Sequence, residues 1–211
     1  MSSLTRVRVK VCGITRLKDA LDCVDLGVDA LGFVFYQKSK RYVEPTKARD
    51  IIYRLPPFVT TVGLFVNTKR SEIEDILRIV PLQLLQFHGN ETENECRVFN
   101  RPYIKAIGIK GGEDFYQIEK DFASAVALLY DTYSKTAFGG TGKIFEWSTI
   151  PSDLTKPWIL AGGLTPENVT QAIRQTQAEN VDVSSGVESD YGIKDKTKVQ
   201  TLISGVSIEK L

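Results

Sequence analysis

The strongest chemical signal in the sequence is a thiol beside a cation, in the segment Lys10-Val11-Cys12-Gly13-Ile14-Thr15. Alternating valines predict a short strand that ends at Cys12, followed by a glycine turn and a helix that Thr15 could cap. Side chains alternate across a strand, so Lys10 and Cys12 share one face. The cation would favour the thiolate, and Cys12 could then act as a general base or a nucleophile. Because buried cysteines are often inert, a purely structural role stays open.

Groups suited to proton transfer also occur where two later strands end. Asp131 directly follows the apolar run 125–130, so it could be a catalytic acid or the cap of a following helix. His88 is the only histidine, and it could take part in the chemistry or simply form a hydrogen bond at the strand end. Gln86 lies two residues before His88 and therefore on the same face. These residues point to acid and base chemistry at one edge of a sheet.

Two glycine-containing segments favour an anion site. They read Leu160-Ala161-Gly162-Gly163-Leu164 and Asp182-Val183-Ser184-Ser185-Gly186-Val187-Glu188. Glycines let backbone N–H groups approach a phosphate, and a short helix beginning there would add a favourable dipole. Two ordinary tight turns are the alternative. The candidate substrate-binding residues in these segments are Gly162, Gly163, Asp182, Ser184, Ser185 and Gly186.

Arg41 and a third glycine-rich segment carry weaker signals. Arg41 follows the predicted second strand, where its planar guanidinium would suit a carboxylate, although a solvated loop arginine is the alternative. Segment 139–143 lacks the first glycine and the final hydroxyl residue of a nucleotide-binding P-loop, and it does not complete a dinucleotide fingerprint. We interpret it as a loop that can close over a site.

Positioning these groups requires a regular succession of strands and helices. Apolar, β-rich runs predict eight strands, at 7–12, 30–35, 60–66, 84–88, 103–109, 125–131, 158–162 and 180–184. Helical patterns cover 17–26, 45–54, 69–79, 91–99, 166–176 and 195–204, with only a short helix expected in 111–121. This alternation implies a parallel sheet, and the count of eight predicts an α/β fold in which one domain, 1–211, forms a single (β/α)8 TIM barrel. In that fold the active site lies at the carboxyl ends of the strands, where the residues above fall.

Composition narrows the function classes. The 211 residues carry 27 basic and 26 acidic side chains, so the net charge of +1 favours neither nucleic acid nor an anionic membrane. The three cysteines have no CxxC spacing, which argues against disulfides and against a metal site. The amino terminus has no apolar signal core, and no apolar run is long enough to cross a bilayer. We therefore expect a cytoplasmic protein whose partner is a small molecule, and no sequence feature indicates an oligomeric state.

Taken together, eight segments resemble the phosphoribosylanthranilate isomerase family of tryptophan biosynthesis. They are KVCGIT, GFVFYQKSKRYV, GLFVN, LLQFHG, LLYDT, GGTGKIFEW, ILAGGLTPENV and DVSSGVE, in the family's order over about residues 7–205. The resemblance implies an Amadori rearrangement, which converts N-(5-phosphoribosyl)anthranilate to 1-(o-carboxyphenylamino)-1-deoxyribulose 5-phosphate. It implies no metal and no organic cofactor.

The resemblance also implies a role for each matching residue. Asp131 matches the general acid, which protonates the furanose ring oxygen and opens the ring to a Schiff base. Cys12 matches the general base, which removes the C2′ proton to give an enolamine that tautomerises to the ketone. Arg41 matches the arginine that holds the anthranilate carboxylate, and the glycines of LAGGL and DVSSGVE match the phosphate-binding loops. Gln86 and His88 match polar residues that line the pocket.

The sequence departs from the family pattern at three positions, and two alternative functions stay open. One departure is Glu146, where an aspartate often precedes the tryptophan. Phe87 stands where leucine is more usual and should face outward, whereas Lys40 stands where proline is common and bears on the pose of Arg41. A histidine-pathway isomerase performs the same rearrangement on a bulkier aminosugar phosphate, but it has an aspartate in place of Cys12 and two similar halves. A non-catalytic barrel that binds a sugar phosphate would have no reason to keep the acid, the base and the anion loops together.

Overall fold

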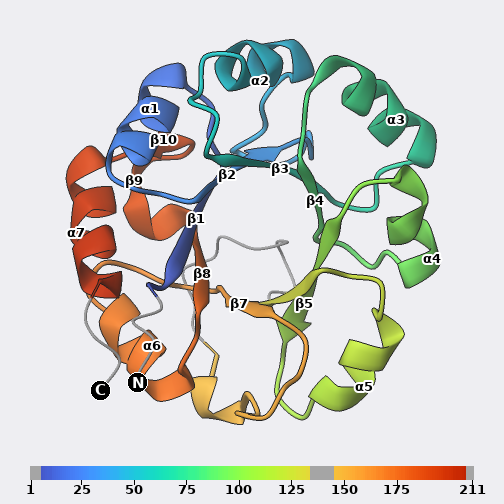
Figure 1. The fold of residues 1–211 in the computed structure, drawn as a ribbon, viewed down its shortest axis with the longest axis vertical. Helices are drawn as coiled ribbons and strands as arrows, with labels where there is room; N and C mark the ends of the chain where they lie inside the picture. The colour runs from blue at the N-terminus through green and yellow to red at the C-terminus, as the bar shows by residue number, and fades with distance from the viewer. Residues whose placement is uncertain (1–5, 134–144, 208–211) are drawn as a thin grey trace.

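The computed structural model describes residues 6–133 and 145–207, in which eight parallel strands close into a barrel. Each strand pairs with its neighbours in chain order, and β1 closes the ring against β8 (Figure 1). The strands are β1 (Arg8–Cys12), β2 (Ala30–Val34), β3 (Thr60–Phe65), β4 (Leu84–Phe87), β5 (Tyr103–Ile109), β6 (Ala127–Thr132), β7 (Trp158–Leu160) and β8 (Asn180–Val183). The predicted eight-stranded α/β barrel is confirmed, with each strand end within two residues of its predicted position.

Helices surround the barrel on its outer face (Figure 1). The α-helices are α1 (Leu17–Asp25), α2 (Pro45–Ile52), α3 (Arg70–Ile79), α4 (Glu93–Cys96), α5 (Phe115–Asp121), α6 (Val169–Thr176) and α7 (Lys196–Val206). In the part of the chain that the structure describes, they are accompanied by the 3₁₀ turns η1 (Arg97–Phe99), η2 (Trp147–Thr149) and η3 (Ser185–Val187). The helix predicted over 91–99 is therefore one turn of α-helix continued by η1. Segment 139–143 lies outside the described residues.

Strand alternation divides the core into an outer and an inner layer. Side chains that face outward pack beneath the helices, among them Val9, Val11, Phe33, Phe65 and Phe87. Phe87 stacks on Phe99 and meets Tyr103 edge to face, so its predicted outward direction is confirmed. Side chains that face inward fill the barrel with a smaller apolar cluster of Ile104, Ala106, Ala127, Leu129, Ile159 and Ala161. The barrel is thus packed, and chemistry is confined to its open end.

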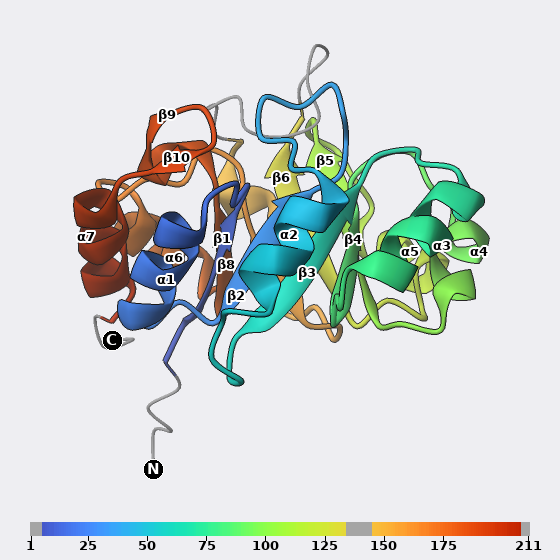
Figure 2. The same cartoon turned by 90° about the horizontal axis from the view of Figure 1, so that it is seen from above.

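A β-hairpin that the sequence patterns did not reveal lies at the rim of that open end. It consists of β9 (Glu188–Asp190) and β10 (Ile193–Lys194), which pair antiparallel. Figure 2 shows it at the same end of the barrel as the loop between β2 and α2. With strands of three and two residues, the hairpin is too short to produce a readable alternation.

The predicted helix cap at Thr15 is wrong, and this hairpin is the physical reason. Helix α1 begins at Leu17, and its N-cap residue is Arg16, whose side chain makes no capping hydrogen bond. The Thr15 hydroxyl instead donates to the backbone carbonyl of Gly192 in the hairpin, 2.6 Å away. Helix α6 also begins later than the predicted residue 166, since its N-cap residue is Asn168. In the described ranges no helix is long and apolar enough to cross a membrane.

Candidate active site

Cys12 and Asp131 lie at the carboxyl ends of their strands, so both belong to the open end of the barrel, which we call the mouth. Both side chains face inward, and the two residues are 5 % and 7 % exposed. In the ring order, β7 and β8 separate β6, which carries Asp131, from β1, which carries Cys12. The loops that follow β7 and β8 therefore lie between the two groups. This arrangement puts the two loops predicted to bind an anion between a carboxyl group and a thiol.

Contacts tie each of these loops to one of the two groups. The Ser184 hydroxyl, after β8, donates to the Cys12 carbonyl at 3.0 Å. Gly162, after β7, lies so close to Asp131 that a β-carbon on it would be 3.0 Å from the Asp131 Oδ1 atom. The predicted register is confirmed, because Cys12, Asp131 and the two loops meet at the same end of the barrel.

Asp131 ends a chain of hydrogen bonds that starts at Gln86. His88 Nε2 lies 3.1 Å from Asp131 Oδ2, and the Gln86 amide nitrogen lies 3.0 Å from His88 Nδ1. With the amide donating to Nδ1, the imidazole proton resides on Nε2 and is donated to Asp131. The backbone N–H of Thr132 donates to the other carboxylate oxygen at 2.7 Å. These hydrogen bonds fix the direction of the Asp131 carboxyl group. They also show that Gln86, His88 and Asp131 lie together, as the sequence predicted.

Cys12 lies beside a buried ion pair. The Lys10 ammonium contacts the Asp182 carboxylate at 2.8 Å, and both side chains are less than a tenth exposed. A β-carbon on Gly32 would lie 2.8 Å from Cys12 Sγ and 3.1 Å from Lys10 Nζ, so the thiol and the ammonium converge over Gly32. Burial opposes the charged form of Lys10, but the attraction of Asp182 outweighs it and raises the pKa of Lys10. Lys10 is therefore a fixed cation.

The expectation that Lys10 makes the thiolate the favoured form of Cys12 is not met. Burial raises the pKa of the Cys12 thiol above its usual value, and the nearby charge of Lys10 offsets only part of that rise. Asp182 neutralises Lys10 and also acts on Cys12 to raise the thiol pKa. In the unliganded protein Cys12 is consequently a protonated thiol at neutral pH.

The two glycine-containing loops are shaped for an anion. Gly162 and Gly163 have φ angles of +83° and +67°, a backbone conformation that side chains rarely adopt. In the described part of the chain, no hydrogen bond occupies the backbone amides of Gly163, Ser185 and Gly186. Free amides grouped at a strand end are the donors that a phosphate requires. The predicted short helix is only the single turn η3, so the amides rather than a helix dipole carry the site.

Replacing Gly186 with alanine should destabilise the protein and weaken the anion site. A β-carbon at this position would lie 1.9 Å from the backbone carbonyl oxygen of Leu164, so one of the two loops must move. We expect a loss of about 1–3 kcal/mol in the free energy of unfolding, the usual cost of overpacking. Urea denaturation measures this, and a change below about 0.5 kcal/mol, the size of an ordinary surface substitution, would contradict the observed packing.

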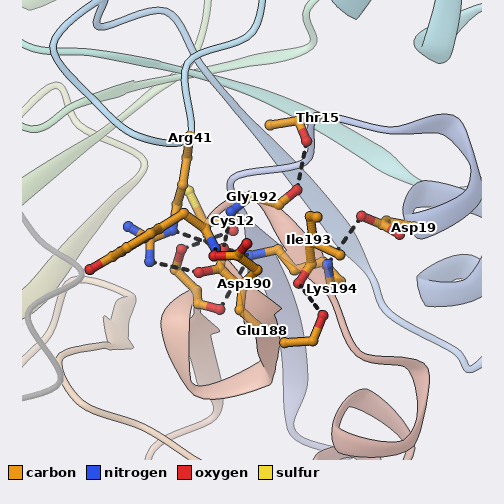
Figure 3. Close-up of polar contacts among 12 residues, drawn as sticks. Cys12, Thr15, Asp19, Arg41, Glu188, Asp190, Gly192, Ile193 and Lys194 are labelled. Carbon is orange, nitrogen blue, oxygen red and sulfur yellow. Dashed lines mark hydrogen bonds and ion pairs between the residues drawn. The ribbon is translucent and has the colours of Figure 1, made fainter.

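Arg41 is not the solvated loop residue that was the alternative interpretation. Its side chain is only 11 % exposed, and its Nε and Nη2 atoms bind the two carboxylate oxygens of Glu188 at 2.9 and 2.7 Å (Figure 3). The aliphatic part of Arg41 packs on Gly13, directly after Cys12. The structure thus places the Arg41 side chain beside the turn that directly follows Cys12. Lys40 does not disturb this pose, because its ammonium lies over the Tyr191 ring.

Two residues of the mouth were not among the predicted site residues. Glu188 ends the motif DVSSGVE, which could have drawn attention to it, whereas nothing in the sequence around Lys194 marks that residue. Lys194 is buried and contacts Glu188 at 2.7 Å. Among the described residues, no cluster of three or more potential ligands could hold a metal ion.

Comparison with known proteins identifies the relatives of this chain. A family model described as N-(5′-phosphoribosyl)anthranilate (PRA) isomerase matches residues 9–204. An N-(5′-phosphoribosyl)anthranilate isomerase of Pseudomonas fluorescens strain Pf0-1 is 55 % identical over 203 residues, which are 96 % of this chain and 100 % of that protein. The protein of the same name from Pseudomonas putida strain GB-1 is 52 % identical over 96 % of this chain and 98 % of its own length.

Solved structures show the same likeness. The phosphoribosylanthranilate isomerase of Thermotoga maritima superposes with a TM-score of 0.87 at 42 % identity, covering 95 % of this chain and 98 % of that one. A phosphoribosylanthranilate isomerase in complex with reduced 1-(o-carboxyphenylamino)-1-deoxyribulose 5-phosphate superposes with a TM-score of 0.84, at the same identity and coverage. At this level the likeness includes the sequence as well as the fold.

Proposed function

The chain belongs to the N-(5′-phosphoribosyl)anthranilate isomerase family, and we propose that it performs this isomerisation with Cys12 as the general base and Asp131 as the general acid. The observation that carries the assignment is the placement of the two phosphate-shaped loops between a carboxyl group and a thiol. A sugar whose phosphate is held by these loops has its ring between the acid and the base. General acid and base groups act only within hydrogen-bond reach of the atoms they serve, so this placement is required for the reaction.

The proposed reaction moves one proton at each group. Asp131 gives its proton to the furanose ring oxygen as the ring C1′–O bond breaks, which leaves a protonated Schiff base between the sugar and the anthranilate nitrogen. The Cys12 thiolate then takes the proton from C2′, and the electrons of that bond neutralise the Schiff base to give an enolamine. A proton then adds to C1′ as the enol O–H proton on C2′ leaves, which gives the ketone, the rearranged product. These two transfers together restore the thiolate of Cys12 and the protonated form of Asp131. The atoms and charges balance without an added metal or organic cofactor.

The remaining site residues are proposed to hold the substrate and the acid. The substrate has an anion at each end, so Arg41 would bind its carboxylate while Gly162, Gly163, Ser184, Ser185 and Gly186 surround its phosphate. Fixing both ends limits the motion of the sugar between the reacting groups. Gln86 and His88 orient Asp131, and Asp182 holds Lys10 beside Cys12. We propose further that 1–211 acts as a single domain and that it works in the cytoplasm.

The pH dependence of kcat/KM tests which of the two groups, Cys12 and Asp131, carries a proton in the reacting enzyme. The reacting form of the enzyme holds one proton on Asp131 and none on Cys12, and transfer of a single proton from the Cys12 thiol to the Asp131 carboxylate produces it. The value of kcat/KM therefore falls at high pH, where both groups have lost their protons. Because burial raises the pKa of Cys12 above its usual 9.0, we expect this alkaline fall to lie above pH 9. Measured profiles of kcat/KM check this. A fall centred near pH 8 would mean that the free enzyme favours the thiolate.

A direct assay separates the proposed activity from its alternatives. Consumption of phosphoribosylanthranilate changes its anthranilate-type fluorescence, so turnover can be followed continuously. We expect rapid turnover of this substrate and little of the bulkier histidine-pathway aminosugar phosphate, because that family has an aspartate in place of Cys12. Binding without turnover would favour a non-catalytic barrel. Comparable turnover of both substrates would indicate a dual-specificity enzyme.

A further inference from the structure

Arg41 is held by a buried cluster of charges that the assigned mechanism does not use. The Glu188 carboxylate accepts two hydrogen bonds from Arg41 and one from Lys194, whose ammonium also donates to the Ser184 carbonyl at 3.2 Å. The backbone N–H of Gly192 completes the set at 3.3 Å. Burial favours the neutral form of Glu188, but the Arg41 hydrogen bond and the Lys194 charge outweigh it and lower the pKa of Glu188. Glu188 is therefore an ionised bridge between the two cations.

The geometry of the bridge leaves one edge of Arg41 open. A guanidinium has five N–H groups in a plane, and Glu188 occupies the edge formed by Nε and Nη2. In the described part of the chain Nη1 has no partner, so the edge formed by Nη1 and Nη2 can bind a second carboxylate with two parallel hydrogen bonds. Glu188 and a substrate carboxylate can thus bind Arg41 at the same time.

The hairpin that carries this bridge is fastened to both neighbouring loops. The Thr15 hydroxyl donates to the Gly192 carbonyl (Figure 3). The Lys40 ammonium lies 3.8 Å from the centre of the Tyr191 ring, and the central carbon of the Arg41 guanidinium lies 5.7 Å from it. The Lys194 backbone N–H donates to the buried carboxylate of Asp19 at 3.1 Å. Because these contacts fix the hairpin, Glu188 holds Arg41 in place before any ligand binds. Less conformational entropy of the Arg41 side chain is then lost on binding.

We propose that Glu188, held in place by its hydrogen bond from Lys194, is a positioning residue that directs the Nη1–Nη2 edge of Arg41 toward the carboxylate of the substrate. The inference rests on the proposed function, because it takes the bound anion to be the carboxyl group of an aryl aminosugar phosphate. A competing possibility makes the opposite prediction. If the substrate had to displace Glu188 from Arg41, removing the charge of Glu188 would strengthen binding rather than weaken it.

Two ligands and three variants test the proposal. The ligands are reduced 1-(o-carboxyphenylamino)-1-deoxyribulose 5-phosphate and its phenylamino counterpart without the carboxylate. For Glu188→Gln we expect the Kd of the first ligand to rise about tenfold and that of the second less than about twofold, since only the first uses Arg41. The double variant Glu188→Gln/Lys194→Met removes the buried charges together and should show the same selectivity. Asp190→Asn, which removes a carboxylate from the exposed part of the same hairpin, should leave both Kd values unchanged.

Calorimetric titration gives the Kd values, and steady-state kinetics should show the loss in KM more than in kcat. Equal weakening of both ligands, in Glu188→Gln and in the double variant, would assign Glu188 a structural role and overturn the proposal. Tighter binding of the carboxylate ligand would overturn it in favour of displacement. Wild-type protein that turns over no phosphoribosylanthranilate would instead refute the proposed function, and the inference with it.

Discussion

Replacement of Cys12 with alanine is expected to lower kcat by at least about a hundredfold, the usual contribution of a general base. The variant cannot take the C2′ proton, and the inward-facing neighbours Val34, Leu64 and Val66 supply no other base. Only a sulfur atom is lost from a small apolar cluster, so the fold should persist. The fluorescence assay measures turnover directly. A rate within about tenfold of wild type would exclude Cys12 as the base.

The chain supplies its own matched controls for this variant. Cys23 in α1 and Cys96 in α4 are also buried, but they belong to the outer apolar cluster between the helices and the barrel. Burial raises the pKa of each to about 12. Alanine at either position should leave kcat close to wild type. Ring opening is assigned to Asp131, so Cys12→Ala should still catalyse exchange between the two anomers of the substrate, which NMR can follow. The pattern separates loss of the base from general damage to the barrel.

Much of the site could be predicted because a strand fixes the direction of its side chains. Once the eight strands are placed, the parity of Cys12, Gln86, Asp131 and Asp182 follows, and the closed ring brings them to one mouth. Phe87 shows the same rule at work on the outer face. Prediction was reliable here because the pattern is local and repeated, and because a one-residue slip would have buried polar groups beneath helices.

The features that escaped prediction depend on contacts between segments far apart in the sequence. Glu188 joins Arg41 across 147 positions, and Thr15 meets Gly192 across 177, so no local pattern contains either contact. The thiol pKa was misjudged for a related reason. The Lys10 side chain is two residues from Cys12, but the carboxylate that neutralises it, Asp182, is 172 positions away. Sequence shows which charges are near along the chain, whereas burial and partners decide their effect.

Replacement of Asp131 with asparagine should also lower kcat by at least about a hundredfold, through a different step. The amide has nearly the same shape, and its oxygen can still accept the backbone N–H of Thr132. Its nitrogen can donate to His88 if the imidazole proton moves to Nδ1 and the Gln86 amide turns over so that its oxygen accepts that proton. What the amide cannot do is give a proton to the ring oxygen. The fold and substrate affinity should therefore be kept while ring opening is lost.

The order of the two proton transfers gives this variant a distinctive signature. Because ring opening precedes removal of the C2′ proton, Asp131→Asn should fail to catalyse anomer exchange, the activity that Cys12→Ala retains. It should also incorporate no deuterium from heavy water at C2′ of the recovered substrate. Asp153→Asn, on the exposed segment before β7, should behave as wild type in both measurements. Anomer exchange at the wild-type rate in Asp131→Asn would move the acid role to another group, and His88, whose imidazole lies 3.1 Å from the same carboxyl group, would be the first to examine.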